Sequence, residues 1–223
     1  NIGAYGVEVC QTIEKVKAIE IDSGEEKWFS NQECQFGYRD SIFKHALYGK
    51  AIVVAIGLTL SKDWQPCNHY GPLKALDIET ISPRVIFDEV CAIRSSKLPD
   101  PAVNGNAGSF FKNPVVSQQQ ANHLLSLYPA MPHYPQANGE VKLAAGWLIE
   151  QAGLKGYRIA GIEVHQQQAL VLVNHGNSTG ADLIAMVQHI QQQVWQCYQI
   201  RLQHEVRLIA SDGECHIDLE ETS

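Results

Sequence analysis

Two prolines close together, Pro99 and Pro101, constrain the fold of this chain most. Proline fixes its own backbone angle and cannot continue a helix, so the pair separates the residues before it from those after it. Upstream, Ser82-Pro83 is a good helix start, and apolar residues then recur at helical spacing up to about Arg94. We therefore predict a linker at the prolines and a domain boundary near Leu98.

Composition and charge exclude several classes of protein. The 223 residues suffice for one large domain or two modest ones, and 45% of them are apolar. The longest apolar run, Ala51 to Leu60, is far shorter than the roughly 20 residues that span a bilayer. A net charge of -7 without a Lys/Arg block argues against a nucleic-acid binder. We expect neither a membrane nor a nucleic-acid partner.

The cysteines and histidines show no pattern typical of a metal site. The six cysteines are scattered without a CxxC pair, and the nine histidines include no HExxH motif. Reduced thiols explain the cysteines better than a disulfide framework or a zinc site. We predict no metal.

The part before the linker is predicted to be rich in strands. Val16 to Ile21 and Glu26 to Phe29 flank a turn and read as a β-hairpin. Ser30 and Glu33 resemble a capping box that opens a short helical turn. Ala51 to Leu60 is the strongest strand, and its nearly continuous apolar character predicts burial on both faces.

The part after the linker mixes helices and strands without strict alternation, which favours an α+β class. The predicted elements are a helix capped by Ser117, a helix over Val141 to Gly153, paired strands over Ile159 to Val164 and Ala169 to Val173, the longest helix opened by Thr179 and Asp182, a strand over Val206 to Ala210, and a last strand within the acidic tail Asp212 to Ser223. Leu183, Val187, Ile190 and Val194 of the longest helix are predicted core.

One turn-rich segment, NGNAGSFFKNP from Asn104 to Pro114, is a plausible place for chemistry. Gly105 and Gly108 permit tight backbone conformations that hold Ser109 at the tip. A surface turn, a nucleophile and a proton donor to carbon are the alternatives for this serine. No G-x-S-x-G elbow surrounds it, so a serine hydrolase is the weaker hypothesis.

Two charged residues are further candidates. Arg39 presents a fork of donors suited to a carboxylate or a developing enolate oxygen, and an ion pair with Asp40 explains it equally well. Glu205 directly precedes the apolar run that starts at Val206. A carboxylate in such a place is most often a solvated charge.

Seven motifs in order give the chain a resemblance that runs over essentially its whole length. They are NIGAYG, FGYRDSIFKH, KLPDP, NGNAGSFFKNP, YPQANGEVKLAAGWLIEQAGLKG, HQQQALVLVN and EVRLIA. Together they resemble UDP-N-acetylenolpyruvoylglucosamine reductases of the MurB type, in the type I form that keeps a tyrosine lid loop, here around Tyr70. Two positions depart from the family pattern: His204, where proline is common, and Leu208, where an aromatic residue is usual.

The resemblance implies a cytoplasmic flavoenzyme of peptidoglycan synthesis, an oxidoreductase that is a monomer when full length. NADPH would reduce bound FAD, and the flavin would reduce UDP-N-acetylglucosamine enolpyruvate to UDP-N-acetylmuramate. By the same resemblance, Ser109 would protonate the substrate carbon, while Glu205 and Arg39 would stabilise developing charge.

The resemblance also implies the binding residues and the domains. Substrate contacts would come from Tyr38, Tyr70, Lys97, Asn113, Tyr134, Lys155 and Gln168, and flavin contacts from Ile2, Gly3, Ala4, Gly6 and Arg39. Residues 1–98 would be the second part of the FAD-binding region, 99–199 the substrate-binding domain, and 200–223 a segment returning to the FAD-binding region.

The first FAD-binding part, with its glycine-rich phosphate loop, would precede Asn1, since the chain opens directly on NIGAYG. We therefore expect residues 1–223 alone to bind FAD weakly or not at all. The competing hypothesis is a UDP-sugar-binding module without turnover.

Overall fold

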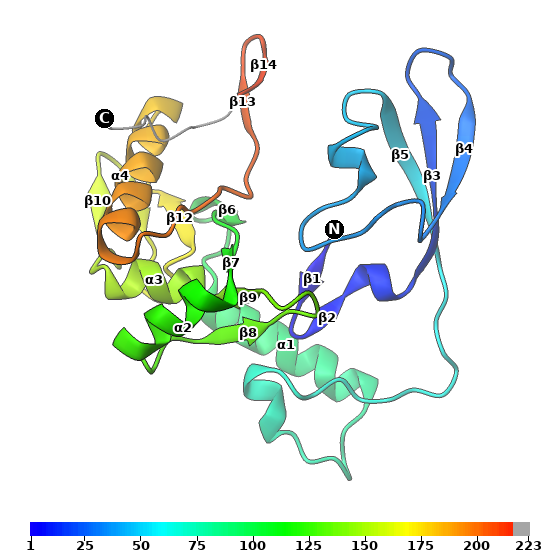
Figure 1. The fold of residues 1–223 in the computed structure, drawn as a ribbon, viewed down its shortest axis with the longest axis horizontal. Coiled ribbons are helices and arrows are strands. Elements are labelled where there is room, and N and C mark those ends of the chain that lie inside the picture. The colour runs from blue at the N-terminus through cyan, green and yellow to red at the C-terminus, as the bar shows by residue number, and fades with distance from the viewer. Residues whose placement is uncertain (216–223) are drawn as a thin grey trace. The chain divides into compact units, whose positions relative to one another are not determined.

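The computed structural model describes residues 1–215, and the chain divides into two compact units, Asn1–Ile93 and a second that begins at Arg94 (Figure 1). Helix α1 (Pro83–Lys97) contains the point of division and runs beyond its predicted end near Arg94. The Ser82 hydroxyl accepts a hydrogen bond from Val85 N at 3.2 Å, as a helix cap does. Helices and strands mix throughout, which confirms an α+β class. The predicted boundary near Leu98 stays a prediction.

The first unit contains a three-stranded antiparallel sheet in the order β4-β3-β5. The predicted hairpin is confirmed by β3 (Ile13–Glu20) and β4 (Glu26–Ser30), with Lys17 opposite Trp28. The expected capping box is also present, since Ser30 N donates to Glu33 Oε2 at 2.8 Å. It encloses a turn, however, and not a helix. The other elements of this unit are β1 (Gly3–Ala4), β2 (Val7–Glu8), η1 (Val9–Gln11), η2 (Ile42–Lys44), β5 (Ala51–Leu58) and η3 (Gly71–Ala75).

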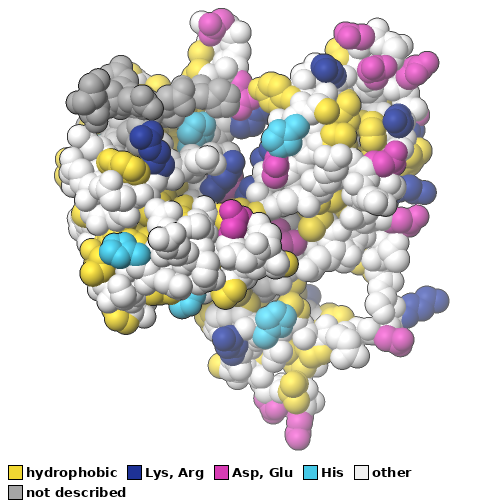
Figure 2. Space-filling model, in the orientation of Figure 1, with side chains coloured by type: hydrophobic (Ala, Val, Ile, Leu, Met, Phe, Trp, Pro, Cys, Tyr) yellow, Lys and Arg dark blue, Asp and Glu magenta, His cyan; other side chains and the backbone are white. Residues whose placement is uncertain are grey.

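Strand β5 contradicts its predicted burial. Ile52 and Ile56 are 57% and 50% exposed, and Val54 is exposed as well. Within residues 1–215, β5 pairs with β3 and with no other strand, so its outer edge and most of its side chains are uncovered. Figure 2 shows hydrophobic side chains reaching the surface in this region. An apolar run indicates a strand suited to burial, but the cover must come from other elements.

Beyond α1, the described part of the second unit contains two small sheets, a C-terminal two-stranded hairpin and three helices. The sheets have the orders β10-β11-β12-β6 and β7-β9-β8. Their strands are β6 (Gly105–Ser109), β7 (Val115–Val116), β8 (His133–Pro135), β9 (Val141–Leu143), β10 (Arg158–Ile159), β11 (Ile162–Val164) and β12 (Val171–Asn174), and the helices are α2 (Gln118–Leu127), α3 (Ala145–Gln151) and α4 (Gly180–Tyr198).

Two predicted elements of this unit are wrong in detail. Residues 141–143 form the central strand β9 and not the first turn of a helix, because they find pairing partners in β7 and β8. Residues 159–164 are not one strand but the hairpin of β10 and β11, which turns at Ala160 in a left-handed conformation (φ 50°). The expected pairing with the following strand is confirmed between β11 and β12.

Helix α4 supplies much of the core of this unit. Thr179 and Asp182, the residues predicted to open this helix, form a capping box, and the predicted cap Ser117 accepts a hydrogen bond from Gln120 N at the start of α2. Val187, Ile190 and Val194 are fully buried, as predicted, in one cluster that includes Phe110 and Phe111. Leu183, the fourth residue predicted for this core, is only partly buried and packs against the same cluster.

The C-terminal hairpin consists of β13 (Leu208–Ala210) and β14 (Gly213–Cys215). The predicted strand over residues 206–210 therefore starts later than expected, at Leu208. The remainder of the predicted tail strand lies outside the described residues.

None of the described helices is long and apolar enough to cross a membrane. No disulfide forms among the six cysteines, all of which lie in residues 1–215.

A buried carboxylate joins the strands at one end of the first sheet of the second unit. Glu163 on β11 is 4% exposed and forms ion pairs with Arg158 and with His175, whose Nε2 lies 2.7 Å from the carboxylate. Burial by itself raises the pKa of Glu163, but hydrogen bonds from His175 and Arg158 outweigh it, so the pKa lies below its ordinary value.

The Glu163 cluster predicts a pH-dependent stability. Because the folded-state pKa is lowered, the carboxylate stabilises the fold above the unfolded-state pKa of about 4.3, and this contribution is lost as pH falls through the folded pKa. Glu163→Gln should lower the free energy of unfolding by about 1–3 kcal/mol near neutral pH, measured by urea unfolding, and should weaken the loss in acid. Glu150→Gln, which removes a half-exposed pair with Lys155, should cost less than about 1 kcal/mol. Equal losses for the two variants would contradict the assignment.

Because β5 is exposed, we expect substitutions at two residues paired across β3 and β5 to differ in their effect on stability. Val16 and Ile56 are paired across β3 and β5, yet Val16 is only 2% exposed. Val16→Lys buries a charge and should cost about 3 kcal/mol or more, whereas Ile56→Lys should change stability by about 0.5 kcal/mol or less and reduce self-association. Thermal unfolding and light scattering measure the two effects. A large stability loss for Ile56→Lys would show that β5 is covered.

Candidate functional site

Ser109 is presented by an irregularity at the end of β6. The pairing with β12 runs from Val173 opposite Asn106 to Val171 opposite Ser109, so β6 holds one more residue than its partner strand. Gly108 in this bulge has φ 73°, a conformation that glycine adopts without strain. The bulge leaves Ser109 exposed at the sheet edge, as the last residue of a strand and not at the tip of a loop as predicted.

Asn106 holds the bulge in shape with both ends of its side-chain amide. Its Nδ2 donates to the carbonyls of Asn104 at 2.8 Å and Pro99 at 3.2 Å, and its Oδ1 accepts from Gly108 N at 3.0 Å. The composition of this segment indicated turns but did not predict the hydrogen bonds of Asn106. An asparagine two residues before a glycine, the spacing of an Asx turn, is the pattern that would have indicated them.

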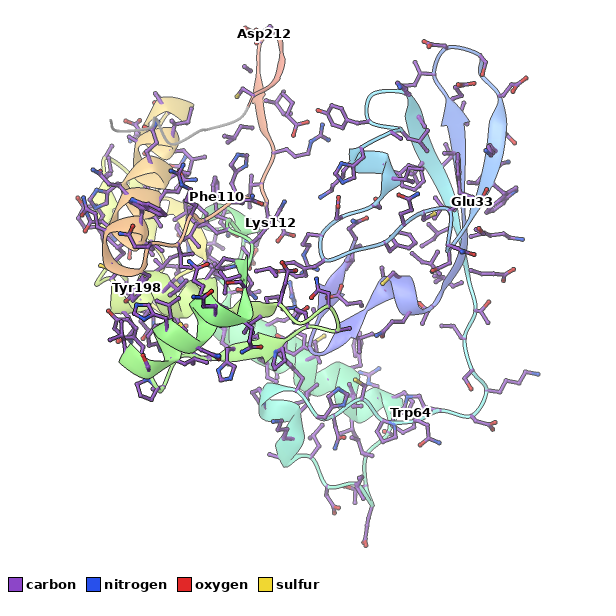
Figure 3. The ribbon with its side chains drawn as sticks, in the orientation of Figure 1. Glu33, Trp64, Phe110, Lys112, Tyr198 and Asp212 are labelled. Carbon is purple, nitrogen blue, oxygen red and sulfur yellow. The ribbon has the colours of Figure 1, made fainter. Side chains whose placement is uncertain are left out.

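Backbone pairing between segments far apart in sequence brings Glu205 opposite Phe110, the residue that follows Ser109. Glu205 N donates to Phe110 O at 2.7 Å, and Lys112 N donates to Gln203 O at 2.9 Å, around an antiparallel bridge between Phe111 and His204. Figure 3 labels Phe110 and Lys112 at this place. Phe110 and Phe111 are buried, so the core anchors this pairing. Two of the predicted catalytic residues thus lie in neighbouring backbone positions.

The start of helix α3 brings together two predicted substrate contacts. Asn113 Oδ1 accepts a hydrogen bond from Ala145 N at 2.9 Å, which satisfies a helix donor that Ala144 cannot cap. Gln168 Oε1 lies 3.4 Å from the position that a Cβ on Gly146 would take, so its amide reaches the first turn of α3.

Tyr134 and Lys142 are cross-strand partners of β8 and β9, so their side chains share one face of that sheet. The position of Lys142 on this face was not predicted. The pattern that would have indicated it is the alternation of Lys142 with the apolar residues Val141 and Leu143, both of which are buried. Lys155 forms an ion pair with Glu150 at 2.8 Å, and Lys97 is the exposed last residue of α1. Glu150 lies in the last turn of α3, so Lys155 contacts the end of this helix opposite to Asn113, and within residues 1–215 no described contact brings Lys97 to α3.

The first unit holds Arg39 against its N-terminal hairpin. Arg39 Nη2 donates to Gly3 O at 2.9 Å, Nη1 lies 3.4 Å from Glu8 Oε2, and the guanidinium carbon lies 5.1 Å from the centre of the Tyr38 ring. The alternative expected for Arg39 is an ion pair with Asp40. The Asp40 carboxylate also accepts a hydrogen bond from His45 at 2.8 Å, and this bond lowers the pKa of Asp40.

The predicted flavin contacts lie in the same hairpin as Gly3. Gly6, in its turn, has φ 83° and approaches the predicted lid residue so closely that a Cβ on it would lie 3.0 Å from Tyr70 Cβ. Ile2 is exposed. An apolar cavity of about 400 Å³ adjoins the turn, with Ala4, Trp64 and Leu73 among its lining residues. Figure 3 labels Trp64.

Two other types of site lack support among the described residues. Within residues 1–215, no described hydrogen bond joins a histidine to Ser109, so the structure adds no observation in favour of the hydrolase hypothesis. No group of three or more His, Cys, Asp or Glu in that range could hold a metal ion.

The fold and these motifs place the chain in a known class of reductase. Residues 100–209 match the family model described as UDP-N-acetylenolpyruvoylglucosamine reductase, C-terminal domain. A solved structure of UDP-N-acetylenolpyruvylglucosamine reductase (MurB) from Thermus caldophilus superposes with a TM-score of 0.56 over 92% of this chain and 56% of that one. At 22% identity this likeness shows the fold alone.

Curated relatives are much more similar in sequence. UDP-N-acetylenolpyruvoylglucosamine reductase from Pseudoalteromonas translucida is 54% identical over 100% of this chain and 66% of its own length, and the Escherichia coli K12 enzyme is 51% identical over 96% and 63%. This chain belongs to the UDP-N-acetylenolpyruvoylglucosamine reductase family, and it spans less than two thirds of the length of these relatives.

The contact between Asn113 and α3 predicts a difference between two substitutions. Asn113→Ala removes the acceptor for Ala145 N and should lower the free energy of unfolding by about 0.5–2 kcal/mol, as the loss of a helix cap does. Asn113→Asp keeps an oxygen in the same place and should retain most of that stability. Urea unfolding of both variants tests the contact, and an alanine variant as stable as the wild type would refute it.

Proposed function

We propose that this chain is part of a cytoplasmic, NADPH-driven flavoenzyme that reduces UDP-N-acetylglucosamine enolpyruvate to UDP-N-acetylmuramate in peptidoglycan synthesis. The observation that carries the proposal is the hydrogen bond from Glu205 N to Phe110 O, which holds Glu205 opposite the residue that follows Ser109. More than half sequence identity to a named reductase supports the same reaction. We infer a monomer for the full-length enzyme.

Ser109 is the proposed proton donor. An alcohol is a weak acid, so it protonates only a strongly basic centre such as the carbanion or enolate that follows hydride addition to the enolpyruvyl group. Exposure at the bulge lets the hydroxyl reach a bound ligand. Glu205 and Arg39 are proposed to stabilise the charge that develops on the substrate before the proton arrives.

The substrate domain is proposed to be residues 99–199, where hydrogen-bond donors suited to a diphosphate gather. Asn113 and Gln168 lie at the start of α3, and Tyr134 lies on one face with Lys142. Lys97, Lys155, Tyr38 and Tyr70 are proposed to complete the substrate contacts. Residues 200–223 are proposed to return to the FAD-binding region.

Residues 1–98 are proposed as the second part of the FAD-binding region, and the N-terminal hairpin fits one edge of a flavin. Small residues, Gly3, Ala4 and Gly6, surround Tyr5 in this hairpin, and Arg39 is anchored to Gly3 O beside them. When bound, FAD would transfer hydride from NADPH to the substrate. Ile2, Gly3, Ala4, Gly6 and Arg39 are the proposed contacts. No glycine-rich phosphate loop occurs in the sequence, so weak FAD binding by residues 1–223 alone remains our prediction.

The uncovered strand β5 supports the need for a further segment. Its apolar side chains are exposed on both faces, as in a strand that normally lies inside a larger sheet. We propose that the part of the family's chain that lies outside this one covers β5.

Substitution of Ser109 separates the reductase from a UDP-sugar-binding module without turnover. We would co-express this chain with the unmatched part of the Pseudoalteromonas translucida relative and measure both substrate titration and substrate-dependent NADPH oxidation. Ser109→Ala should reduce turnover by about 10²- to 10⁴-fold and leave binding nearly unchanged, because only the proton donor is lost. Ser126→Ala, on α2 in the same unit, is the control and should not affect turnover.

The two hypotheses give opposite results for the wild-type complex. Binding of UDP-N-acetylglucosamine enolpyruvate without any NADPH oxidation would support the binding module and overturn the enzyme.

A further inference from the structure

The turn of the N-terminal hairpin contains an unusual residue. Ala4 and Val7 close a two-residue loop whose central residues, Tyr5 and Gly6, have φ 53° and 83°. Two positive φ values in a two-residue hairpin are typical of a type I′ turn, in which asparagine, aspartate or glycine normally takes the first place. A bulky aromatic residue in the left-handed region is strained, because its Cβ crowds the backbone.

Strain of this kind persists only where surrounding contacts hold it, and it is a pointer to function. The Tyr5 ring packs edge to face against the Tyr70 ring, with centroids 6.4 Å apart and planes at 85°. Gly6 closes on Tyr70 from the same turn, since a Cβ there would lie 3.0 Å from Tyr70 Cβ. Tyr70 itself is 41% exposed and lies at the end of a segment without regular structure, just before η3. The hairpin therefore supplies two contacts to an otherwise exposed side chain.

The cavity beside the turn also borders the segment that leads to Tyr70. Tyr5 is part of the cavity wall, together with Trp64, Gln65 and Cys67 of the segment that leads to Tyr70. A segment that borders a cavity has fewer packing contacts on that side, so each remaining contact contributes more to its position.

We propose that Tyr5 is a positioning residue: its strained conformation places an aromatic ring against Tyr70 and holds the Tyr70 segment beside the Gly6 turn in the orientation that receives the substrate diphosphate. The orientation of Tyr70 toward the substrate diphosphate rests on the proposed function, in which Tyr70 contacts the UDP-sugar. A residue needed only to make the turn would be asparagine or glycine, which adopt this conformation with less strain.

Two substitutions separate positioning from turn formation. Tyr5→Asn removes the ring and supplies the residue that the turn prefers, and Tyr5→Phe keeps the ring. Three quantities are measured on this chain: the melting temperature, amide hydrogen exchange over residues 68–76, and the affinity for UDP-N-acetylglucosamine by isothermal titration.

We expect Tyr5→Asn to melt no lower than the wild type, because relief of strain offsets the lost contact. Exchange over residues 68–76 should become faster, and affinity weaker, each by about twofold to tenfold, the range that loss of one aromatic pair gives. Tyr5→Phe should match the wild type in all three measurements.

Several results would overturn the proposal. These are unchanged exchange over residues 68–76 in Tyr5→Asn, faster exchange with unchanged affinity, a lower melting temperature with wild-type affinity, or failure of Tyr5→Phe to restore the wild-type values. If the wild-type chain does not bind UDP-N-acetylglucosamine, the substrate part of the proposed function fails, and the exchange measurement alone decides whether Tyr5 holds the Tyr70 segment.

Discussion

The pairing of residues 110–112 with residues 203–205 is the interaction on which the candidate site of the second unit depends. It is short, but buried Phe110 and Phe111 anchor one side of it in the core. The bulge in β6 sets the exposure of Ser109, and the pairing fixes which residue of the returning chain lies next to it. Ser109 and Glu205 lie close in the fold because the two backbone segments pair. This pairing does not depend on a contact between their side chains.

Features encoded in neighbouring residues could be predicted from the sequence. The hairpin of β3 and β4, the capping box of α4 and the buried stripe of that helix all follow from local spacing. Features that depend on distant partners could not. β9 becomes a strand because β7 and β8 pair with it, and β5 is exposed because nothing in residues 1–215 covers it. Propensity describes what a segment favours, but tertiary neighbours decide what it does.

The site shows the same division. Composition marked the loop around Ser109, but only resemblance singled out Glu205, since a lone carboxylate before an apolar run has no local signature. The hydrogen bonds of Asn106 and the position of Lys142 opposite Tyr134 were not predicted, because each depends on which neighbour the residue meets in the fold.

Asn113 shows how two hydrogen-bonding functions limit the side chains that one position can accept. Its amide oxygen completes α3, and the proposed diphosphate site needs a hydrogen-bond donor from the same side chain. Aspartate would serve the helix but repel an anion, serine is too short to do both, and alanine does neither. If the proposed diphosphate contact holds, few other side chains could serve both the helix and the substrate at this position. An inhibitor that contacts Asn113 would therefore be hard to escape by substitution at that position.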